Sequence, residues 1–320
     1  MRIAVMGTGS FGVPTLEMLY ETEHEIAALV TQPAARSPRG KELPPPEIVQ
    51  CAMRHGTPIV RFEKIKSPEA VAYLKSLNAD LFFICDYGQI LSREGIQAAR
   101  LGGLNLHGSL LPRYRGAAPV QWAVYNGDKT AGITVIYITP EIDAGPMVEK
   151  AALEVLPDET ADQLERRLAK LGAPCVVRAI HELAANEDLR NHALPQDPLQ
   201  ASGAPKLKKT DAHIDWTRSA TQIRNQIRAL EPWPRTYTDW ERVPGKPPVR
   251  LMILPVPTLL STELPPGTPP GTVLSVGETL DVATGDGILS IRRVQPSGKK
   301  PMDIPSFANG YGIKKGSVLF

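Results

Sequence analysis

The sequence of 320 residues contains few cysteines, no histidine pair with metal-ligand spacing and no long apolar run. Its three cysteines lie far apart and form no Cys-x-x-Cys motif, so we expect reduced thiols of a cytoplasmic protein and no disulfide framework. None of the six histidines forms a His-x-x-x-His pair, and the sequence therefore predicts no metal site. Apolar runs such as Leu81–Cys85 are far too short to span a bilayer, and we expect no membrane association.

The composition is that of an ordinary globular protein, with 42% hydrophobic and 22% charged residues, and the length allows two domains. The first seven residues carry one basic side chain and mostly apolar ones before a glycine, which predicts a first strand and not a signal peptide. Residues 201–320 hold 16 basic and 10 acidic residues, a charge of +6, whereas residues 1–200 carry −4. The basic C-terminal third indicates a polyanionic partner.

Short apolar runs alternate with helical patterns through residues 1–150. The predicted strands are Arg2–Met6, Glu25–Val30, Pro58–Val60, Asp80–Cys85, Gly103–Leu106 and Gly132–Tyr137. The predicted helices are Pro14–Tyr20, Pro46–His55, Ser67–Leu77 and Val120–Tyr125. This order predicts an α/β fold with a doubly wound, mostly parallel sheet and helices on both of its faces. In such sheets ligands bind outside the carboxyl ends of the strands.

After residue 150 the composition and the apolar pattern of the chain change twice. An edge strand over Val148–Val155 and a long helix over Thr160–Ala185 complete a first domain, residues 1–189. Residues 190–206 belong to a stretch rich in proline and polar residues, which predicts a linker. Residues 207–320 contain one short helix and then short β-rich runs separated by proline and glycine, which predicts a small β-barrel of the oligonucleotide-binding type.

Residues 102–119 contain the main candidate site. The strand Gly103–Leu106 delivers Asn105 and His107 at positions i and i+2, so both side chains point to one face at its end. An amide and an imidazole side by side can polarise a carbonyl group and move a proton. Alternatively, Asn105 caps a turn and His107 is a satisfied core histidine. The pairing of the two, ahead of a basic loop with Arg113 and Arg115, favours a site.

Asp143 lies in the loop that follows the strand Gly132–Tyr137. If that strand neighbours Gly103–Leu106, the carboxylate reaches His107, orients the imidazolium and accepts a proton from an attacking amine. The alternative, a turn shaped by Asp143 and Gly145, is about equally supported, because Asp-x-Gly is common in turns.

Residues 7–12 form a Gly-x-Gly-x-x-Gly motif directly after the first strand. The motif by itself indicates a dinucleotide site. Such a site also needs an acidic residue at the end of the second strand, and Leu29–Pro33 offers none. We therefore interpret these glycines as turn and packing residues and expect no NAD. An NAD(P)-dependent oxidoreductase is the weaker alternative.

Asn105-x-His107-Gly-Ser-Leu-Leu-Pro112, followed by Tyr114-Arg-Gly116 and by Asp143, is similar to the signature of the methionyl-tRNA formyltransferase family. The resemblance covers essentially the whole chain. It implies a formyltransferase-type catalytic domain over residues 1–189, a linker, and a tRNA-binding barrel over residues 207–320. It also implies a monomeric cytoplasmic enzyme of translation initiation. This enzyme transfers a formyl group from its co-substrate, 10-formyltetrahydrofolate, to the methionine amino group of initiator methionyl-tRNA, with Asn105, His107 and Asp143 as catalytic residues.

The same resemblance implies binding residues for both substrates. The folate-binding residues implied are Tyr87, Gly88, Ile90, Leu91, Ser109, Leu110, Leu111 and Pro112. For the tRNA, the resemblance implies contacts from the loop that contains Arg39 and Lys41. The basic residues themselves predict a track for a polyanion, made of Arg36, Arg39, Lys41, Lys206, Lys208, Lys209, Lys299 and Lys300, with Arg224 and Arg228 extending it.

The sequence departs from the family pattern at Gly9, Asp86, Glu141, Pro146 and His213, and none of these is a proposed catalytic residue. A sugar-nucleotide formyltransferase or a folate hydrolase would share the catalytic residues but would not need a basic C-terminal domain. A plain RNA-binding protein would not need the Asn, His and Asp cluster.

Overall fold

The computed structural model describes residues 1–33, 43–255, 258–260 and 264–320. The chain divides into two compact units. The first unit comprises residues 1–119, 130–154 and 165–205, and the second comprises residues 120–129, 155–164 and 206–320.

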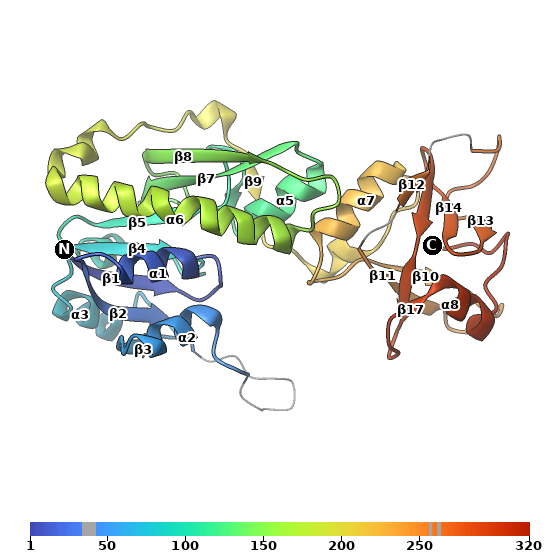
Figure 1. Ribbon diagram of the computed structural model, residues 1–320, viewed down its shortest axis with the longest axis horizontal. Helices are drawn as coiled ribbons and strands as arrows, with labels where there is room; N and C mark the ends of the chain where they lie inside the picture. The colour runs from blue at the N-terminus through green and yellow to red at the C-terminus, as the bar shows by residue number, and fades with distance from the viewer. Residues whose placement is uncertain (34–42, 256–257, 261–263) are drawn as a thin grey trace. The chain divides into compact units, whose positions relative to one another are not determined.

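The first unit is built on a seven-stranded sheet with the strand order β3-β2-β1-β4-β5-β7-β8 (Figure 1). Its strands are β1 (Arg2–Gly7), β2 (Glu25–Thr31), β3 (Ile59–Arg61), β4 (Leu81–Cys85), β5 (Gly103–His107), β7 (Thr130–Tyr137) and β8 (Met147–Glu154). The first five are parallel, whereas β7 runs antiparallel to both β5 and β8. The predicted mostly parallel sheet is therefore confirmed.

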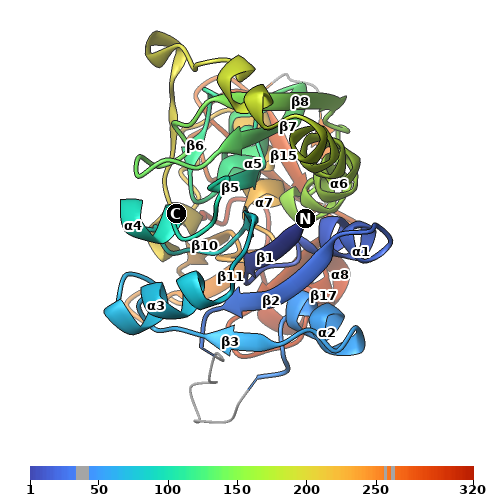
Figure 2. The same cartoon turned by 90° about the vertical axis from the view of Figure 1, so that its left-hand side faces the viewer.

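Helices cover both faces of this sheet, as the doubly wound prediction requires. Figure 2 places α1, α2 and α6 on one side of the sheet and α3 and α4 on the other. The helices of the first unit are α1 (Val13–Tyr20), α2 (Glu47–Arg54), α3 (Pro68–Ser76), α4 (Arg93–Ile96) and most of α6 (Ala161–Ala185), whereas α5 (Pro119–Asn126) belongs almost wholly to the second unit. The apolar run of β4 is buried at every position, because a strand covered on both faces has no solvent side.

Residues 190–206, which the sequence predicts as a linker, contain short regular elements. The segment 186–206 contains the 3-10 helices η1 (Glu187–His192) and η2 (Pro198–Gln200) and the short strand β9 (Gly203–Ala204). Strand β9 pairs in parallel with β6 (Arg115–Gly116), and Leu194 pairs with Met147 at the start of β8. Backbone hydrogen bonds thus fasten this segment to the loops of the first unit.

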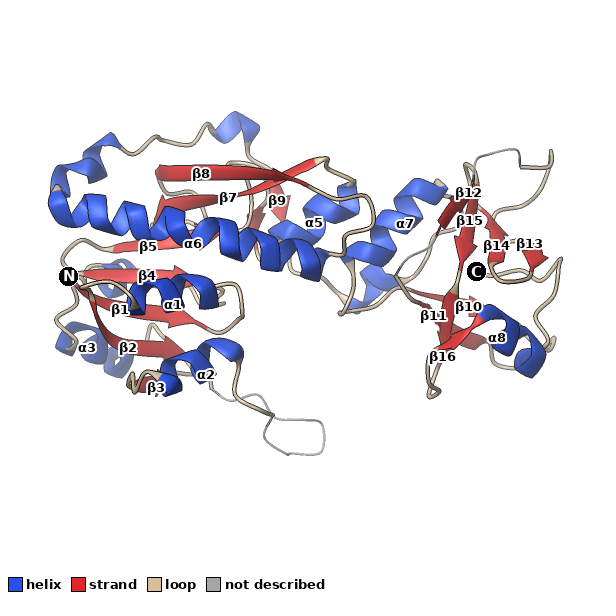
Figure 3. Ribbon diagram, viewed as in Figure 1, coloured by secondary structure: helices blue, strands red, loops and turns tan. Residues whose placement is uncertain are grey.

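The second unit contains two four-stranded antiparallel sheets among its described residues, β10-β11-β16-β17 and β12-β15-β14-β13 (Figure 3). Its strands are β10 (Tyr237–Trp240), β11 (Val249–Ile253), β12 (Thr258–Leu260), β13 (Val273–Val276), β14 (Leu280–Ala283), β15 (Ile288–Ile291), β16 (Arg293–Pro296) and β17 (Met302–Asp303). Its other elements are η3 (Lys209–Ala212), α7 (Ala220–Ala229) and α8 (Ile304–Tyr311). The predicted short strands are present and pair in antiparallel fashion, and closure into one barrel stays a prediction.

The core of the second unit gathers apolar side chains from both sheets and both helices, with Trp216, Trp240 and Phe307 among them. Within the described part of the chain, no helix is long and apolar enough to cross a membrane.

Candidate active site

Strand β5 presents two polar side chains at the carboxyl edge of the sheet. Asn105 and His107 are two residues apart and therefore lie on the same face of β5. His107 is buried at 5% exposure, whereas Asn105 is half-buried. Among the described residues the Asn105 amide has no protein hydrogen-bond partner, so it is available to a ligand.

The two ring nitrogens of His107 have different surroundings. Nε2 lies 2.9 Å from the backbone oxygen of Tyr114, and Nδ1 lies 3.6 Å from Oδ2 of Asp143. Because a carbonyl oxygen only accepts hydrogen bonds, Nε2 must carry the hydrogen that it donates to Tyr114. Nδ1 is then the ring nitrogen that faces the carboxylate of Asp143.

Asp143 reaches this place from the connection between β7 and β8. The backbone N–H of Gly116 donates to its Oδ2 at 2.9 Å, and its side chain is 16% exposed. Its backbone is left-handed, with φ 49°, a conformation that Asp tolerates better than most residues. The structure thus brings His107 and Asp143 together and places Asn105 on the same strand as His107.

The loop after β5 carries the expected folate-binding residues Ser109–Pro112. Its conformation is fixed by Thr134 of β7, whose hydroxyl donates to the backbone oxygen of Ser109 at 2.7 Å and accepts from the Leu111 N–H at 3.0 Å. The Ser109 hydroxyl donates to the backbone oxygen of Arg113 at 2.6 Å. Lys150 donates to the backbone oxygen of Leu111, and desolvation lowers the pKa of the lysine. Ser109 and Leu111 are buried, whereas Leu110 and Pro112 are half-buried.

The expected folate-binding residues after β4 divide into buried and exposed ones. Tyr87 and Leu91 are 2% and 7% exposed and belong to the sheet core, and burial raises the pKa of Tyr87 to about 12. Gly88 and Ile90 are exposed. Gln32 donates to the backbone oxygen of Tyr87 at 2.6 Å, which ties this segment to the end of β2.

Asp86 begins that segment, and its carboxylate lies against the glycine-rich turn. A Cβ atom added at Gly9 would lie 2.4 Å from Oδ2 of Asp86, so Gly9 leaves room for the carboxylate. The side chain of Asp86 is exposed, and its carboxyl is also partly desolvated by the protein around it. This desolvation raises the pKa of its carboxyl, and the charge of His107 and the backbone N–H of Phe11 oppose the rise. A pyrophosphate at this turn would meet a carboxylate, which is a like charge when ionised.

The expected tRNA-binding residues are only partly placed. Arg36, Arg39 and Lys41 lie outside the described residues. The five expected lysines of the second unit are all exposed: Lys206, Lys208, Lys209, Lys299 and Lys300.

The prediction that two arginines of α7 extend this basic track is wrong for Arg228. For Arg224 it loses support, because a carboxylate of the protein already pairs with that guanidinium. Arg228 is 6% exposed and donates to the backbone oxygen of Glu159 at 3.1 Å and to the side chain of Asn225, also at 3.1 Å. Arg224 pairs with Asp158. A buried guanidinium that already serves internal acceptors cannot reach a phosphate group of RNA.

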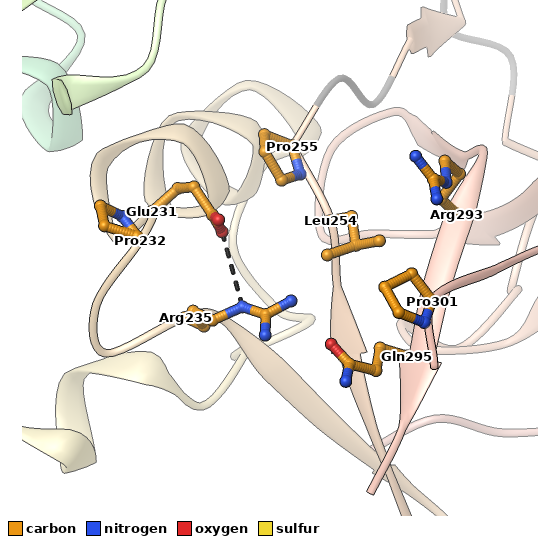
Figure 4. Close-up of a pocket in the computed structure, with 8 residues that line it drawn as sticks. All are labelled: Glu231, Pro232, Arg235, Leu254, Pro255, Arg293, Gln295 and Pro301. Carbon is orange, nitrogen blue, oxygen red and sulfur yellow. Dashed lines mark ion pairs between the residues drawn. The ribbon is translucent and has the colours of Figure 1, made fainter. Parts of the chain in front are cut away.

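A pocket of about 500 Å³ opens in the second unit between the end of α7 and strands β11 and β16 (Figure 4). It is lined by Glu231, Pro232, Arg235, Leu254, Pro255, Arg293, Gln295 and Pro301. Nε of Arg235 lies 3.7 Å from Oε2 of Glu231, too far for a hydrogen bond. Burial raises the pKa of Glu231, and Arg235 opposes that rise. Two guanidinium groups and a glutamine amide make the pocket suited to an anionic or hydrogen-bonding ligand.

One further cluster of ionisable groups lies at the opposite, amino edge of the sheet. Glu23, His24 and His181 bring one ligand-type atom each to within 4.8 Å of one another. This arrangement was not predicted from the sequence, where the three residues show no metal-binding spacing. The cluster lies away from Asn105 and His107 and takes no part in the candidate active site.

Sequence reasoning missed two residues that support the site. Gln196 contacts the loop of Asp143, and Ser202 accepts a hydrogen bond from the Tyr114 N–H at 2.9 Å. Both lie in the segment interpreted as a linker, and no local pattern marks them.

Comparisons with known proteins identify the family. Residues 1–180 match the family described as Formyl transferase, and residues 206–312 match Formyl transferase, C-terminal domain. The chain is 40% identical to the methionyl-tRNA formyltransferase of Rhodopirellula baltica, over 100% of this chain and 96% of that protein. It is 38% identical to the methionyl-tRNA formyltransferase of Symbiobacterium thermophilum, over 99% and 94% of the two chains.

Solved structures show the same fold at lower identity. HypX from Aquifex aeolicus in complex with tetrahydrofolic acid has a TM-score of 0.64 at 17% identity, covering 98% of this chain and 48% of that one. WlaRD, a sugar 3N-formyl transferase, has a TM-score of 0.62 at 18% identity, covering 94% and 99%. On its similarity to full-length relatives, the chain belongs to the methionyl-tRNA formyltransferase family.

Proposed function

We propose that the protein transfers a formyl group from 10-formyltetrahydrofolate to the α-amino group of methionine on initiator methionyl-tRNA. The product is N-formylmethionyl-tRNA, which starts translation. The observation that carries the proposal is the approach of Nδ1 of His107 to Oδ2 of Asp143 at 3.6 Å, on the strand edge that also presents Asn105. The full-length similarity to methionyl-tRNA formyltransferases supports the choice of substrates.

In the proposed reaction the methionine amine attacks the formyl carbon, a new C–N bond forms, and the carbonyl oxygen becomes an oxyanion. The Asn105 amide and protonated Nδ1 of His107 donate hydrogen bonds to this oxyanion. One such donor typically contributes about 3–4 kcal/mol to transition-state stabilisation. The hydrogen bond from Nε2 to Tyr114 fixes the ring with Nδ1 on the side of Asp143, where we propose that the formyl group binds.

Asp143 has two tasks in this scheme. Its carboxylate stabilises the imidazolium of His107, and it accepts a proton from the attacking amine. When the oxyanion collapses, the bond between the formyl carbon and N10 of the folate breaks, and N10 takes up a proton. No covalent bond to the protein forms at any step.

We place the folate between the two loops at the carboxyl edge of the sheet. Gly88 and Ile90 are exposed there, and Leu110 and Pro112 are half-buried, so these four offer side-chain or backbone contacts. The remaining expected residues, Tyr87, Leu91, Ser109 and Leu111, are buried and act by shaping the two loops.

We assign tRNA binding to residues 207–320, which we propose form an oligonucleotide-binding barrel joined through residues 190–206 to a catalytic domain of residues 1–189. The exposed lysines, from Lys206 to Lys300, and the pocket with Arg235 and Arg293 offer positive charge to an RNA backbone. Arg36, Arg39 and Lys41 keep their proposed role at the acceptor end of the tRNA. The enzyme is proposed to act as a monomer in the cytoplasm, where translation begins.

The test compares two acceptors with the same labelled 10-formyltetrahydrofolate. We expect formyl transfer to charged initiator methionyl-tRNA and none to an amino-sugar nucleotide. Transfer to the sugar nucleotide alone would assign the protein to the alternative class of formyltransferase. Release of labelled formate without either acceptor product would indicate a folate hydrolase.

A further inference from the structure

We propose that Gln196 is a positioning residue of the active site, which holds the Asp143 carboxylate in place beside His107. The proposal rests on the formyl transfer proposed above and adds a residue to it. Gln196 lies 53 positions from Asp143 along the chain, in the segment whose composition suggested a linker.

The Gln196 side chain uses all of its hydrogen-bonding capacity on two loops. Its amide NH₂ donates to the backbone oxygens of Asp143 at 2.7 Å and Gly145 at 2.8 Å. Its amide oxygen accepts from Nε of Arg115 at 3.0 Å and from Nη2 of the same guanidinium at 2.7 Å. A carbonyl only accepts and a guanidinium only donates, so this orientation of the amide is the one that the partners permit.

The partner Arg115 stands between two residues that contact the catalytic pair directly. The backbone oxygen of Tyr114 accepts from Nε2 of His107 at 2.9 Å, and the N–H of Gly116 donates to Oδ2 of Asp143 at 2.9 Å. Three consecutive residues therefore fix the imidazole, the glutamine and the carboxylate. Gln196 bonds both Arg115 of this tripeptide and the backbone of Asp143. It thereby links the residues that hold His107 to the loop that carries the carboxylate.

Among the described residues, two hydrogen bonds besides those of Gln196 hold the loop of Asp143 before its end: the Gly116 N–H donates to Oδ2 of Asp143 at 2.9 Å, and the Thr139 hydroxyl donates to the backbone oxygen of Glu141 at 3.0 Å. At its start Glu141 and Ile142 are exposed, the latter at 55%, so apolar packing does not anchor this part of the loop. At its end the Tyr137 N–H donates to the backbone oxygen of Pro146 at 2.9 Å. Gln196 bonds the middle of the loop, at the backbone oxygens of Asp143 and Gly145. Asp143 has a left-handed backbone there, with φ 49°.

Loss of these bonds moves the carboxylate, and displacement of a catalytic group by about 1 Å can cost about 100-fold in rate. We expect Gln196→Ala to lower kcat for formyl transfer by about 10- to 100-fold. The KM values for both substrates should change by less than about 3-fold, because Gln196 acts through Asp143 and contacts neither substrate.

The experiment measures kcat, both KM values and the thermal midpoint for three single variants of the full chain. Gln196→Glu keeps two acceptor sites for Arg115 but presents an oxygen to the two carbonyls, and we expect a loss of kcat similar to that of Gln196→Ala. It also replaces the alanine variant if that one does not fold. Gln200→Ala is the matched control, because among the described residues the side chain of this exposed glutamine bonds only Asp197, at 2.9 Å, and its kcat should stay unchanged.

A double-variant cycle separates positioning from a general structural role. In an Asp143→Ala background the carboxylate is gone, and Gln196→Ala should lower kcat by less than about 2-fold more. A repeat of the full single-variant loss in that background would overturn the proposal, and so would a kcat of Gln196→Ala equal to that of the wild type. A wild-type protein that transfers no formyl group to methionyl-tRNA would defeat the proposed function first, and this proposal with it.

Discussion

Replacing Gly9 by alanine tests the interpretation of the glycine-rich turn most sharply. The added Cβ would lie 2.4 Å from Oδ2 and 3.1 Å from both Cβ and Cγ of Asp86. The carboxylate must retreat by roughly 1 Å to restore an ordinary contact, and overpacking of this kind typically costs about 1–3 kcal/mol. The backbone at Gly9 does not have the positive φ that disfavours alanine, so the loss should come from the Asp86 contact.

A double-variant cycle checks that origin. Asp86→Ala removes Oδ2 and Cγ, two of the three atoms that the new methyl group meets, and in that background Gly9→Ala should cost less than about 1 kcal/mol. The coupling between the two sites is then at least about 1 kcal/mol, as expected for residues in contact.

The free energy of unfolding is measured in urea by circular dichroism for the wild type, both single variants and the double variant. Gly203→Ala is the control, because a Cβ there meets no atom within 4 Å, and its stability should change by less than about 0.5 kcal/mol. Strictly additive effects at Gly9 and Asp86 would refute the reasoning.

The other predictions concern catalysis, pH and RNA binding. Asn105→Ala should lower kcat by about 10²–10³-fold with little change in the Kd of 10-formyltetrahydrofolate; a proportionate loss of folate affinity in binding titrations would argue against an oxyanion donor. Because desolvation raises the pKa of the Asp86 carboxyl, the native state binds its proton more tightly than the unfolded state, and wild-type stability falls as pH rises through the raised pKa. Asp86→Asn should therefore gain stability relative to the wild type over that pH window in urea titrations, and a difference independent of pH would contradict this. Lys299→Ala and Lys300→Ala should each reduce the slope of log K against log salt for tRNA by about 1. Arg228→Met should leave that slope unchanged but lower stability by about 1–3 kcal/mol, because buried carbonyl oxygens lose their donor; equal salt slopes for all three variants would contradict the assignment.

The sheet and the central pair of site residues were predictable because both follow from local rules. An apolar run such as that of β4 predicts a buried strand, and a spacing of two residues in a strand places Asn105 and His107 on one face. The approach of Asp143 needed a tertiary fact, the pairing of β7 with β5, which the sequence only made reasonable.

Other features were visible in the sequence but not used. Helix α8 begins after Asp303, whose side chain accepts from the Ser306 N–H at 2.8 Å, and ends at Gly312 with φ 77°. An N-cap aspartate and a C-terminal glycine are ordinary helix boundaries. The helix was missed because strong β patterns surround it.

Gln196 and Gly9 mark the limit of sequence reasoning. Gln196 matters through two loops that are distant in sequence, and nothing beside it indicates that contact. Gly9 satisfies a dinucleotide motif, yet in the structure its missing side chain makes room for the Asp86 carboxylate. The same glycine spacing leaves room for a bound pyrophosphate or for the Asp86 carboxylate. The residue at the end of the neighbouring strand therefore decides which of the two lies against the turn.

The single-turnover rate of formyl transfer by Asp143→Asn tests the central claim most directly. Asparagine keeps the size of the side chain and an acceptor for the Gly116 N–H but neither stabilises the imidazolium of His107 nor accepts a proton. We expect a rate about 10²–10⁴-fold below that of the wild type, with the Kd of 10-formyltetrahydrofolate unchanged within about 3-fold. A rate within 10-fold of the wild type, or a loss explained by weaker folate binding, would contradict it.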